Sequence, residues 1–430
     1  MGLTAKRTVI IGLDGMPHRL IKDLSENGTM PNVKALIKEG VFRQMESSIP
    51  EVSSVAWSSI ITGKNPGEHG IFGFTDLAPG TYRTVYPNFS TLKTASFWER
   101  KSTGRSVIIN VPSTYPAREL NGVLIAGFVA LDLEKATYPR SLVPRLQKMD
   151  YRVDVDSQKA HQSLGFFLRD LDRTFQARIS AYRYLWNKET WDTFMLVFTG
   201  TDRLAHFLWD AYEDEGHKHR LAFMDHFRQI DKVVGEIVQQ LTEKDTVILL
   251  SDHGFESLEK DIYVNFFLRQ RGYLKFKDDD AHNLKAIAQG TRAFALDPAR
   301  IYLNLKGKYP QGSVEPQDRN AVLDDLENAF RALEIEGKKV IKRVYRKEEL
   351  YEGPQAYRAP DLVLLANEGF NLRANVRAKQ LWGKGVFMGK HSQNDAFLLV
   401  RDDSAPEIVP ETPCVSDVIS IMDKSRNRRV

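Results

Sequence analysis

Near its N-terminus the chain reads Thr8-Val-Ile-Ile-Gly-Leu-Asp14, followed by Gly15, and this segment is the strongest indication of the fold class. A short apolar run that ends in a turn signal predicts a buried strand of an α/β core. The run is too short to span a membrane, and the N-terminus lacks the layout of a signal peptide. We therefore expect the core to begin almost at the first residue, with Asp14 at the carboxyl end of its first strand.

Similar apolar runs recur along the chain and alternate with helical patterns. The other predicted strands are 106–109, 123–126, 194–199, 246–250, 362–365 and 396–400, and the predicted helices are 32–39, 94–101, 162–188, 219–240 and 415–422. The strands are apolar on both faces, as strands covered by helices are. The alternation predicts a three-layer α/β/α sandwich with a mostly parallel central sheet.

Two stretches interrupt this alternation. Residues 131–160 are charged and irregular, and residues 266–358 form a looser, more basic mixture of short strand and helix patterns. We interpret 266–358 as an inserted cap or accessory region that packs over the sheet. Residues 1–265 and 359–430 then form the catalytic core.

The composition narrows the class of protein. Of 430 residues, 42% are hydrophobic and 27% are charged, which is typical of globular chains and excludes disordered and collagen-like ones. With 60 Lys and Arg against 56 Asp and Glu, the net charge of +4 is too small to indicate a nucleic-acid or membrane partner. The single cysteine, Cys414, cannot form an internal disulfide, which fits a cytoplasmic location.

Residues able to bind a metal follow several of the predicted strands. They are Asp14, Asp202 with His206, Asp252 with His253, and His391 in a glycine-rich loop. In open α/β sheets, ligands bind beyond the carboxyl ends of the strands. Asp202 and His206 are four residues apart, so a helix would place both on one face. Each segment alone also fits a turn aspartate or an ordinary helix pair.

Taken together, the three carboxylates and three imidazoles are expected at the same edge of one sheet. Neighbouring carboxylates repel one another unless a positive charge lies among them. Zn²⁺ accepts this mixture of nitrogen and oxygen ligands, and Mn²⁺ is an alternative. The set predicts two metal sites with open coordination positions.

A serine pair at a predicted helix start is the candidate for a nucleophile. The segment runs from Ile49 to Gly63 and contains Ser53 and Ser54. Serine is a frequent N-cap, which is the structural alternative. The functional alternative uses the same position, because backbone amides at a helix N-terminus bind phosphate and a metal there would activate the hydroxyl.

These motifs resemble the alkaline phosphatase superfamily, and within it the type I phosphodiesterase/nucleotide pyrophosphatase family. The resemblance rests on Asp14, on the Ser53 helix ending at Thr62-Gly63, on Pro66-Gly-Glu-His69-Gly70, on Asp202 with His206, on Ser251-Asp252-His253-Gly254 and on Gly389-Lys-His391. The motifs occur in the order of the family and extend over roughly residues 8 to 400.

The resemblance implies an enzyme with two metal ions, usually zinc. Asp202, His206 and His391 would hold one ion, and the other would be held by Asp14, Ser53, Asp252 and His253. The nucleophile of the family is Thr or Ser, and the register to Thr62-Gly63 places it at Ser53, with Ser54 as the adjacent alternative. The implied activity is metal-dependent hydrolysis of a small phosphodiester or pyrophosphate, with a nucleotide as one candidate substrate.

One departure from the family concerns phosphate recognition. Nucleotide-cleaving members have an Asn in the stretch after His-Gly, whereas His69-Gly70 is followed here by Ile-Phe-Gly-Phe-Thr-Asp76. Asn110, at the end of a predicted strand, is the alternative phosphate contact, and Ser54 would offer its backbone amide. Other activities on the same scaffold are phosphomonoester hydrolysis, phosphonate hydrolysis and phosphoryl transfer. A non-catalytic binding protein would be expected to lack a metal ligand, and none of the six is missing.

Overall fold

The protein is described here by a computed structural model, which covers residues 6–278 and 281–427. The chain divides into two compact units. The first comprises Met1–Lys64, Asn88–Glu256 and His391–Val430, and the second comprises Asn65–Pro87 and Ser257–Lys390. The segment 266–358, expected as an insertion, lies within the second unit, which also takes in residues on both sides of it and the separate stretch 65–87.

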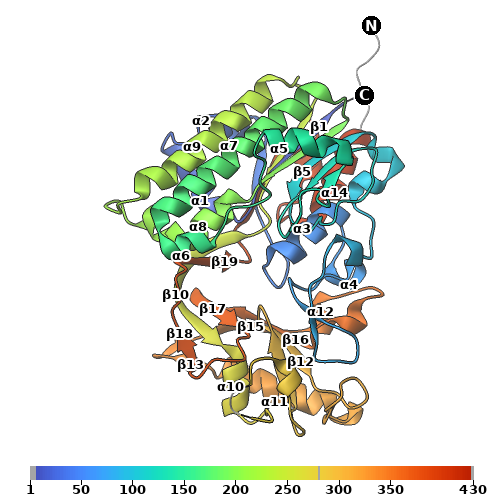
Figure 1. Ribbon diagram of the computed structural model, residues 1–430, viewed down its shortest axis with the longest axis vertical. Coiled ribbons are helices and arrows are strands. Elements are labelled where there is room, and N and C mark those ends of the chain that lie inside the picture. Colours follow the sequence, from blue (N-terminus) through green and yellow to red (C-terminus); the bar gives the residue numbers. More distant parts are fainter. Residues whose placement is uncertain (1–5, 279–280, 428–430) are drawn as a thin grey trace. The chain divides into compact units, whose positions relative to one another are not determined.

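An eight-stranded sheet forms the centre of the first unit (Figure 1). Its order is β2 (Val41–Met45), β20 (Ala396–Arg401), β9 (Thr246–Leu250), β1 (Thr8–Leu13), β8 (Thr193–Phe198), β5 (Ser106–Val111), β6 (Gly122–Ala126) and β7 (Thr137–Tyr138). Strands β9, β1, β8, β5 and β6 are parallel to one another, whereas β20 and β7 are antiparallel to their neighbours. The predicted, mostly parallel α/β sandwich is thereby confirmed.

The parallel strands have the sequences that a doubly covered sheet requires. All residues of β1, β5, β6, β8 and β9 are buried, because helices lie on both faces and no alternate residue reaches water. The register pairs Leu13 of β1 with Phe198 of β8 and Gly12 with Leu250 of β9. The carboxyl ends of these three strands therefore lie side by side, which brings the residues that follow them to one edge.

Two groups of helices flank this sheet (Figure 1). One group contains α1 (His18–Glu26), α2 (Pro31–Glu39), α7 (Leu164–Lys188), α8 (Gly200–Glu213) and α9 (Arg220–Gln239). The other contains α3 (Ser53–Thr62) and α14 (Val418–Asn427), and the short helices α5 (Val143–Lys148) and α6 (Gln158–Gln162) belong to the same unit. No helix in residues 6–278 and 281–427 is both long and apolar enough to cross a membrane.

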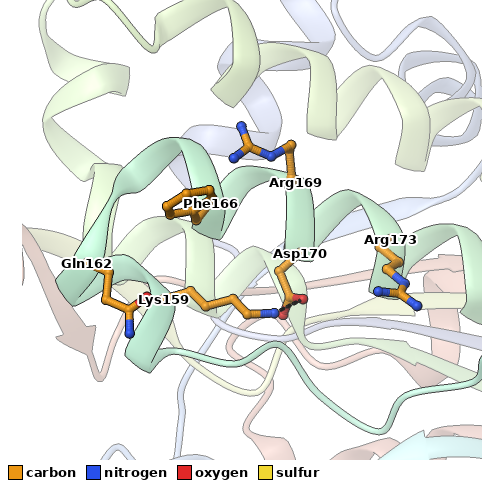
Figure 2. A pocket seen from close by; sticks show the side chains of 6 residues that line it. All are labelled: Lys159, Gln162, Phe166, Arg169, Asp170 and Arg173. Carbon is orange, nitrogen blue, oxygen red and sulfur yellow. Dashed lines mark hydrogen bonds and ion pairs between the residues drawn. The ribbon is translucent and has the colours of Figure 1, made fainter.

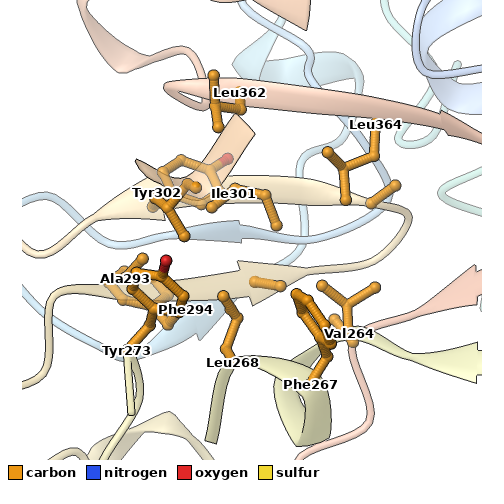
Figure 3. Close-up of a cluster of buried hydrophobic side chains, with 14 of the residues drawn as sticks. Val264, Phe267, Leu268, Tyr273, Ala293, Phe294, Ile301, Tyr302, Leu362 and Leu364 are labelled. Atoms are coloured by element: carbon orange, nitrogen blue, oxygen red, sulfur yellow. The ribbon is translucent and has the colours of Figure 1, made fainter. Parts of the chain in front are cut away.

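The second unit has a core of its own, built around an antiparallel sheet (Figure 3). This sheet contains β11 (Ala293–Leu296), β12 (Arg300–Leu303), β16 (Leu362–Ala366) and β15 (Ile341–Arg346). A second sheet contains β17 (Gly369–Arg373), β10 (Gly254–Tyr263), β18 (Trp382–Gly383) and β19 (Gly389–Ser392). Residues 254–256 of β10 and 391–392 of β19 belong to the first unit. The helices of the second unit are α10 (Val264–Gln270), α11 (Arg319–Arg331) and the short α4 (Pro66–His69) and α12 (Lys347–Leu350). The unit buries its own apolar residues, such as Phe267, Phe294 and Leu364.

Two sequence predictions about local structure are wrong. The run 362–365, grouped above with the strands of the central sheet, is β16 and pairs with β12 and β15 in the antiparallel sheet. The helix expected over 94–101 is replaced by two 3₁₀ turns, Phe97–Glu99 and Lys101–Thr103. Glu99 accepts hydrogen bonds from the backbone N–H and the hydroxyl of Ser96, and Arg100 is extended, so the turn closes on itself.

Candidate active site

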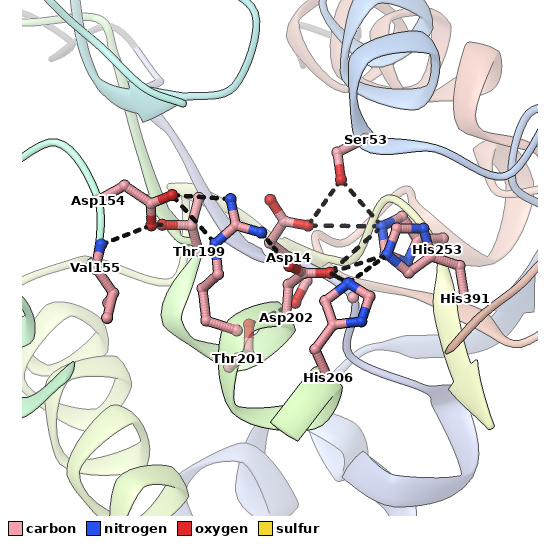
Figure 4. A network of polar contacts seen from close by, with 12 residues as sticks. Asp14, Ser53, Asp154, Val155, Thr199, Thr201, Asp202, His206, His253 and His391 are labelled. Atoms are coloured by element: carbon pink, nitrogen blue, oxygen red, sulfur yellow. Dashed lines mark hydrogen bonds and ion pairs between the residues drawn. The ribbon is translucent and has the colours of Figure 1, made fainter. Parts of the chain in front are cut away.

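The seven side chains expected to bind metal or attack substrate lie together in the first unit. All of them except Asp252 are labelled in Figure 4. They come from the turn after β1, the first residue of α3, helix α8, the turn after β9 and strand β19. In this order they are Asp14, Ser53, Asp202 with His206, Asp252 with His253, and His391. The parallel register explains the assembly, because β1, β8 and β9 are neighbours and end at the same edge.

Three of these side chains form one donor cluster. The Oδ1 atom of Asp202 lies 3.1 Å from Nε2 of His391 and 3.5 Å from Nε2 of His206. The two imidazole nitrogens are 3.1 Å apart. Asp202 and His206 reach this point from one face of α8, as their spacing of four residues predicts.

A second cluster adjoins the first and includes the candidate nucleophile. Nε2 of His253 lies 3.3 Å from Oδ2 of Asp252 and 3.7 Å from Oδ1 of Asp14. The hydroxyl of Ser53 is 3.1 Å from the same Nε2 and 3.4 Å from Oδ1 of Asp14. The imidazoles of His253 and His391 are stacked with their centroids 3.7 Å apart, so the two clusters are neighbours.

Backbone carbonyls fix which imidazole nitrogens face the centre. Nδ1 of His391 lies 2.9 Å from the carbonyl oxygen of Glu51, and Nδ1 of His253 lies 3.1 Å from that of Gly254. A carbonyl only accepts, so Nδ1 must carry the proton in each ring. Nε2 of each neutral ring therefore presents a lone pair toward carboxylate oxygens, which is the arrangement of a metal ligand with an outer hydrogen bond.

The carboxylates are held by donors on their outer sides. Trp57 donates its indole N–H to Oδ2 of Asp14 at 3.3 Å, and the N–H of Gly15 donates to Oδ1 of Asp252 at 3.0 Å. The Trp57 ring reaches Asp14 because Gly12 has no side chain: a Cβ atom there would lie 2.5 Å from the indole. Oδ2 of buried Asp252 has no hydrogen-bond donor among the described residues.

Burial disturbs the ionisation of two of the carboxylates. It raises the pKa of Asp252 to about 7, against the opposing effect of the hydrogen bond from Gly15, and the charge of Asp202 adds a smaller upward contribution. Burial together with Asp252 and Asp202 also holds the pKa of Asp14 well above its ordinary value. Without a cation, the second cluster therefore retains a proton near neutral pH.

The first cluster is electrostatically different. Burial alone would raise the pKa of Asp202, but His206, His391 and Arg203 outweigh it and lower that pKa. Burial likewise opposes the charge on His391, but Asp202 raises the pKa of this imidazole. Burial and the neighbouring His391 lower the pKa of His253. Asp202 is therefore ionised, whereas His253 is neutral.

These donors fit divalent metal ions. Each cluster has three ligand atoms within 4.8 Å of one another, Asp202, His206 and His391 in one and Asp14, Asp252 and His253 in the other. Lone pairs of imidazole nitrogens and carboxylate oxygens face one another at close range, and Asp252 has an oxygen without a donor. A cation between these atoms would remove both the repulsion between the lone pairs and the cost of burying a carboxylate oxygen without a partner. The nitrogen and oxygen donor set suits Zn²⁺ or Mn²⁺.

The structure distinguishes the two serines at the start of α3. Ser53 is the first helical residue, not the N-cap, which is Val52, and no side chain caps this end. The capping alternative for Ser53 is therefore wrong, and its hydroxyl faces His253 and Asp14 instead. The buried hydroxyl of Ser54 has no hydrogen-bond partner among the described residues.

Asn110 occupies the carboxyl end of β5 and is fully buried. Its amide donates to the carbonyl of Val197 at 3.2 Å and to the hydroxyl of Thr199 at 3.4 Å. Its backbone is in the left-handed region, with φ of 64°. These contacts hold β5 to β8, and in the described part of the chain none of its hydrogen bonds is to the seven clustered side chains.

Sequence reasoning missed two residues beside the site. Arg203 donates to Asp202 and forms an ion pair with Asp154, which lies in the stretch regarded above as charged and irregular. No periodicity relates Arg203 to Asp154, because they are far apart in the chain and Asp154 lies outside any helix or strand. An arginine directly after a candidate metal ligand was the only local signal.

A separate cavity of about 360 Å³ lies along α6 and the first turns of α7 (Figure 2). Its lining residues are Lys159, Gln162, Phe166, Arg169, Asp170 and Arg173. Its carboxylate, Asp170, is neutralised by Arg152 and Lys159. None of the seven clustered side chains lines it, so we do not assign the chemistry to this cavity.

Comparison with known proteins identifies the family. Residues 8–393 match the family described as type I phosphodiesterase / nucleotide pyrophosphatase. The chain belongs to this family. It is therefore a member of the alkaline phosphatase superfamily, and the resemblance seen in the sequence is confirmed. Membership of this metal-dependent family makes the protein a hydrolase that acts on phosphoesters.

Two solved structures have a fold similar to that of this chain. Phosphonoacetate hydrolase from Sinorhizobium meliloti 1021 in complex with phosphonoformate has a TM-score of 0.67 at 15% identity, over 98% of this chain and 96% of that chain. An inactive variant of murine ectonucleotide pyrophosphatase / phosphodiesterase 5 in complex with AMP has a TM-score of 0.56 at 15% identity, over 98% and 95%. No curated protein matches the chain in sequence at a significant level.

Proposed function

We propose that the protein hydrolyses a small phosphodiester or pyrophosphate, with Ser53 as nucleophile and two divalent metal ions as cofactors. The position of the Ser53 hydroxyl carries this proposal. It lies 3.1 Å from Nε2 of His253 and 3.4 Å from Oδ1 of Asp14, inside one of the two metal-donor clusters. A hydroxyl at this point lies among the ligands of an ion that would favour loss of its proton and stabilise the resulting oxygen.

The residues that would hold the ions follow from the two clusters. Asp202, His206 and His391 would bind one ion, and Asp14, Asp252 and His253 would bind the other together with Ser53. When bound, divalent ions supply Lewis acidity and neutralise charge on the phosphoryl oxygens. Zn²⁺ is the first candidate and Mn²⁺ the second, on the basis of the ligand types.

Ser53 performs the covalent step in this proposal. Its Oγ forms a bond to phosphorus while the bond between phosphorus and the leaving oxygen breaks, and the proton of the hydroxyl ends on the departing oxygen. Water then cleaves the bond between Ser53 and phosphorus, which releases the product and restores the hydroxyl. Because Ser53 is the first residue of α3, the substrate phosphoryl group would also meet the N–H groups at this helix end, including that of Ser54.

Hydrolysis of a phosphonate is the second candidate function. The structure of phosphonoacetate hydrolase has a TM-score of 0.67 against this chain, whereas the structure of the pyrophosphatase/phosphodiesterase has a TM-score of 0.56. The same nucleophile and ions would serve both reactions, because both begin with attack on a phosphorus atom. The two candidates differ in the leaving group, which is an oxygen in one case and a carbon in the other.

A substrate panel combined with trapping of the intermediate tests the proposal. Turnover is measured on an aryl phosphodiester, a dinucleoside pyrophosphate, an aryl phosphomonoester, phosphonoacetate and an aryl sulfate, in chelated protein and after addition of Zn²⁺ or Mn²⁺. Rapid acid quench followed by peptide mass spectrometry locates any phosphoryl adduct.

The proposal expects metal-dependent turnover of the diester or the pyrophosphate and an adduct on Ser53. Faster turnover of phosphonoacetate with the same adduct would replace the first candidate with the second. An adduct on Ser54, or none under conditions where product forms in a burst, would refute the assignment of Ser53.

A further inference from the structure

The guanidinium of Arg203 forms ion pairs with Asp202 and with a fourth carboxylate, Asp154, beside the first cluster. Its Nη1 is 3.1 Å from Oδ2 of Asp202. Its Nε and Nη2 are 3.1 Å and 2.8 Å from Oδ2 of Asp154. The guanidinium carbon is also 4.3 Å from the ring centroid of Phe128, so a cation–π contact fixes the plane of the group.

The two oxygens of Asp202 have different partners as a result. Oδ2 is taken by Arg203, whereas Oδ1 faces Nε2 of His391 at 3.1 Å and Nε2 of His206 at 3.5 Å. A carboxylate without an outer donor can rotate and present either oxygen, or both, to a cation. With Oδ2 occupied by a charged donor, Asp202 presents Oδ1 alone to the same point as the two imidazoles.

Asp154 is itself held in place, which makes Arg203 a rigid donor. Its Oδ1 accepts from the backbone N–H of Val155 at 2.9 Å and from the hydroxyl of Thr199 at 3.4 Å. Thr199 is the residue directly before α8, the helix that carries Asp202. The chain of contacts therefore starts and ends at the N-terminus of one helix and passes through Asp154 and Arg203.

We infer that Arg203 and Asp154 are a positioning pair, which sets the orientation of Asp202 as a single-oxygen ligand of the ion bound with His206 and His391. This inference rests on the proposed function, because it assumes that the first cluster binds a metal ion. Because the ion pair of Arg203 with Asp154 is neutral as a unit, removing both side chains leaves the local net charge unchanged and tests the orienting contacts. Outer hydrogen-bond partners of this kind typically change metal affinity by about 10- to 100-fold when they are removed.

The test removes the pair without changing the local net charge. The double variant Arg203→Met, Asp154→Asn replaces the ion pair by neutral side chains of similar length. Its matched control is Arg183→Met, Glu236→Gln, which removes an ion pair of similar geometry between α7 and α9, where the Arg183 Nη2 to Glu236 Oε2 distance is 2.7 Å. The readout is the Zn²⁺ affinity of the chelated protein, measured by competition with a chromophoric chelator, alongside the thermal midpoint without metal.

We expect the double variant to bind one of two Zn²⁺ ions about 10- to 100-fold more weakly and the other ion with unchanged affinity. The control variant should bind both ions as the wild-type protein does. Unchanged affinity for both ions would overturn the inference while leaving the proposed function intact. If wild-type protein binds no Zn²⁺ or Mn²⁺ at all, the proposed function fails and this inference fails with it.

A single variant keeps the inference testable if the double variant does not fold. Arg203→Lys retains the positive charge but has one nitrogen in place of three, so it cannot contact both carboxylates as Arg203 does. We expect a smaller loss of affinity for the same ion. Tighter or unchanged Zn²⁺ binding in Arg203→Lys would show that Arg203 does not act by orienting Asp202.

Discussion

Replacement of Asp252 by Asn should stabilise the metal-free protein at alkaline pH, although most substitutions of buried residues destabilise. Asp252 is fully buried, and Oδ2 has no hydrogen-bond donor among the described residues. Asn keeps the oxygen that accepts from Gly15 and replaces the other by an amide N–H, 3.3 Å from the lone pair of His253 in the present geometry. The substitution thus removes a buried charge and adds a second donor beside Nε2 of His253, which otherwise shares the single Ser53 hydroxyl with Asp14.

The pKa of Asp252 gives the size of the effect. Burial raises this pKa from an ordinary 3.8 to about 7, a difference of about three pH units, and each unit corresponds to about 1.4 kcal/mol. The folded wild-type protein holds a proton that the unfolded chain has lost, so its stability falls as pH rises from about 4 to about 7. Above pH 7 the loss is about 4 kcal/mol, and Asp252→Asn should avoid it.

Thermal unfolding with excess chelator, at pH values from 5 to 8, measures this difference. The midpoint of Asp252→Asn should exceed that of wild type by several degrees at pH 8, and the two should converge toward pH 5. Added Zn²⁺ should raise the wild-type midpoint and have a much smaller effect on the variant. Asp172→Asn, an exposed position on α7, is the control and should follow wild type.

Parallel curves of thermal midpoint against pH for wild type and Asp252→Asn would refute this reasoning, because they would mean that burying the ionised carboxylate without metal does not destabilise the protein. A variant that is less stable than wild type at every pH would do the same.

Three further predictions concern other residues. Ser53→Ala should lower turnover by roughly 10³-fold or more with nearly unchanged metal content, whereas Ser54→Ala should lower it only mildly because the backbone amide remains. Steady-state kinetics and metal analysis of both variants test this, and comparable losses of turnover would contradict the assignment of Ser53. Gly12→Ala should cost about 1–3 kcal/mol of stability and alter Trp57 fluorescence, because a Cβ atom would lie 2.5 Å from the indole; an unchanged midpoint and spectrum would argue against this contact. Asn110→Ala should lower the thermal midpoint because it removes two hydrogen bonds, at a cost of about 1–3 kcal/mol of stability, while the KM for substrate stays within a factor of two. A large rise in KM would show instead that Asn110 contacts the substrate.

Much of the central sheet could be predicted because its strands are buried on both faces. The runs 9–13 and 246–250 are almost entirely apolar, and an aspartate follows each of them within two residues. The parallel register then brings these ends together without further information. The spacing of Asp202 and His206 likewise determines that one helix face carries both.

The remaining features depend on contacts between distant segments, which local patterns do not encode. Residues 362–365 are as apolar as the central strands, yet β16 pairs with β12 and β15 in the second unit, and nothing in its own sequence indicates those partners. Trp57 is an apolar residue within a buried helix, and only the proximity of Gly12 turns its N–H toward Asp14. The contact of Arg203 with Asp154 joins a helix to an irregular segment, so no repeat could predict it.

We expect the two donor clusters to bind two metal ions that the hydrolysis needs. A titration of chelated protein with Zn²⁺ tests this, with bound metal per chain and turnover of an aryl phosphodiester measured on the same samples. Binding should saturate at two ions per chain, and turnover, absent in the chelated protein, should reach its maximum at that point. Full turnover in protein that contains no metal would contradict it.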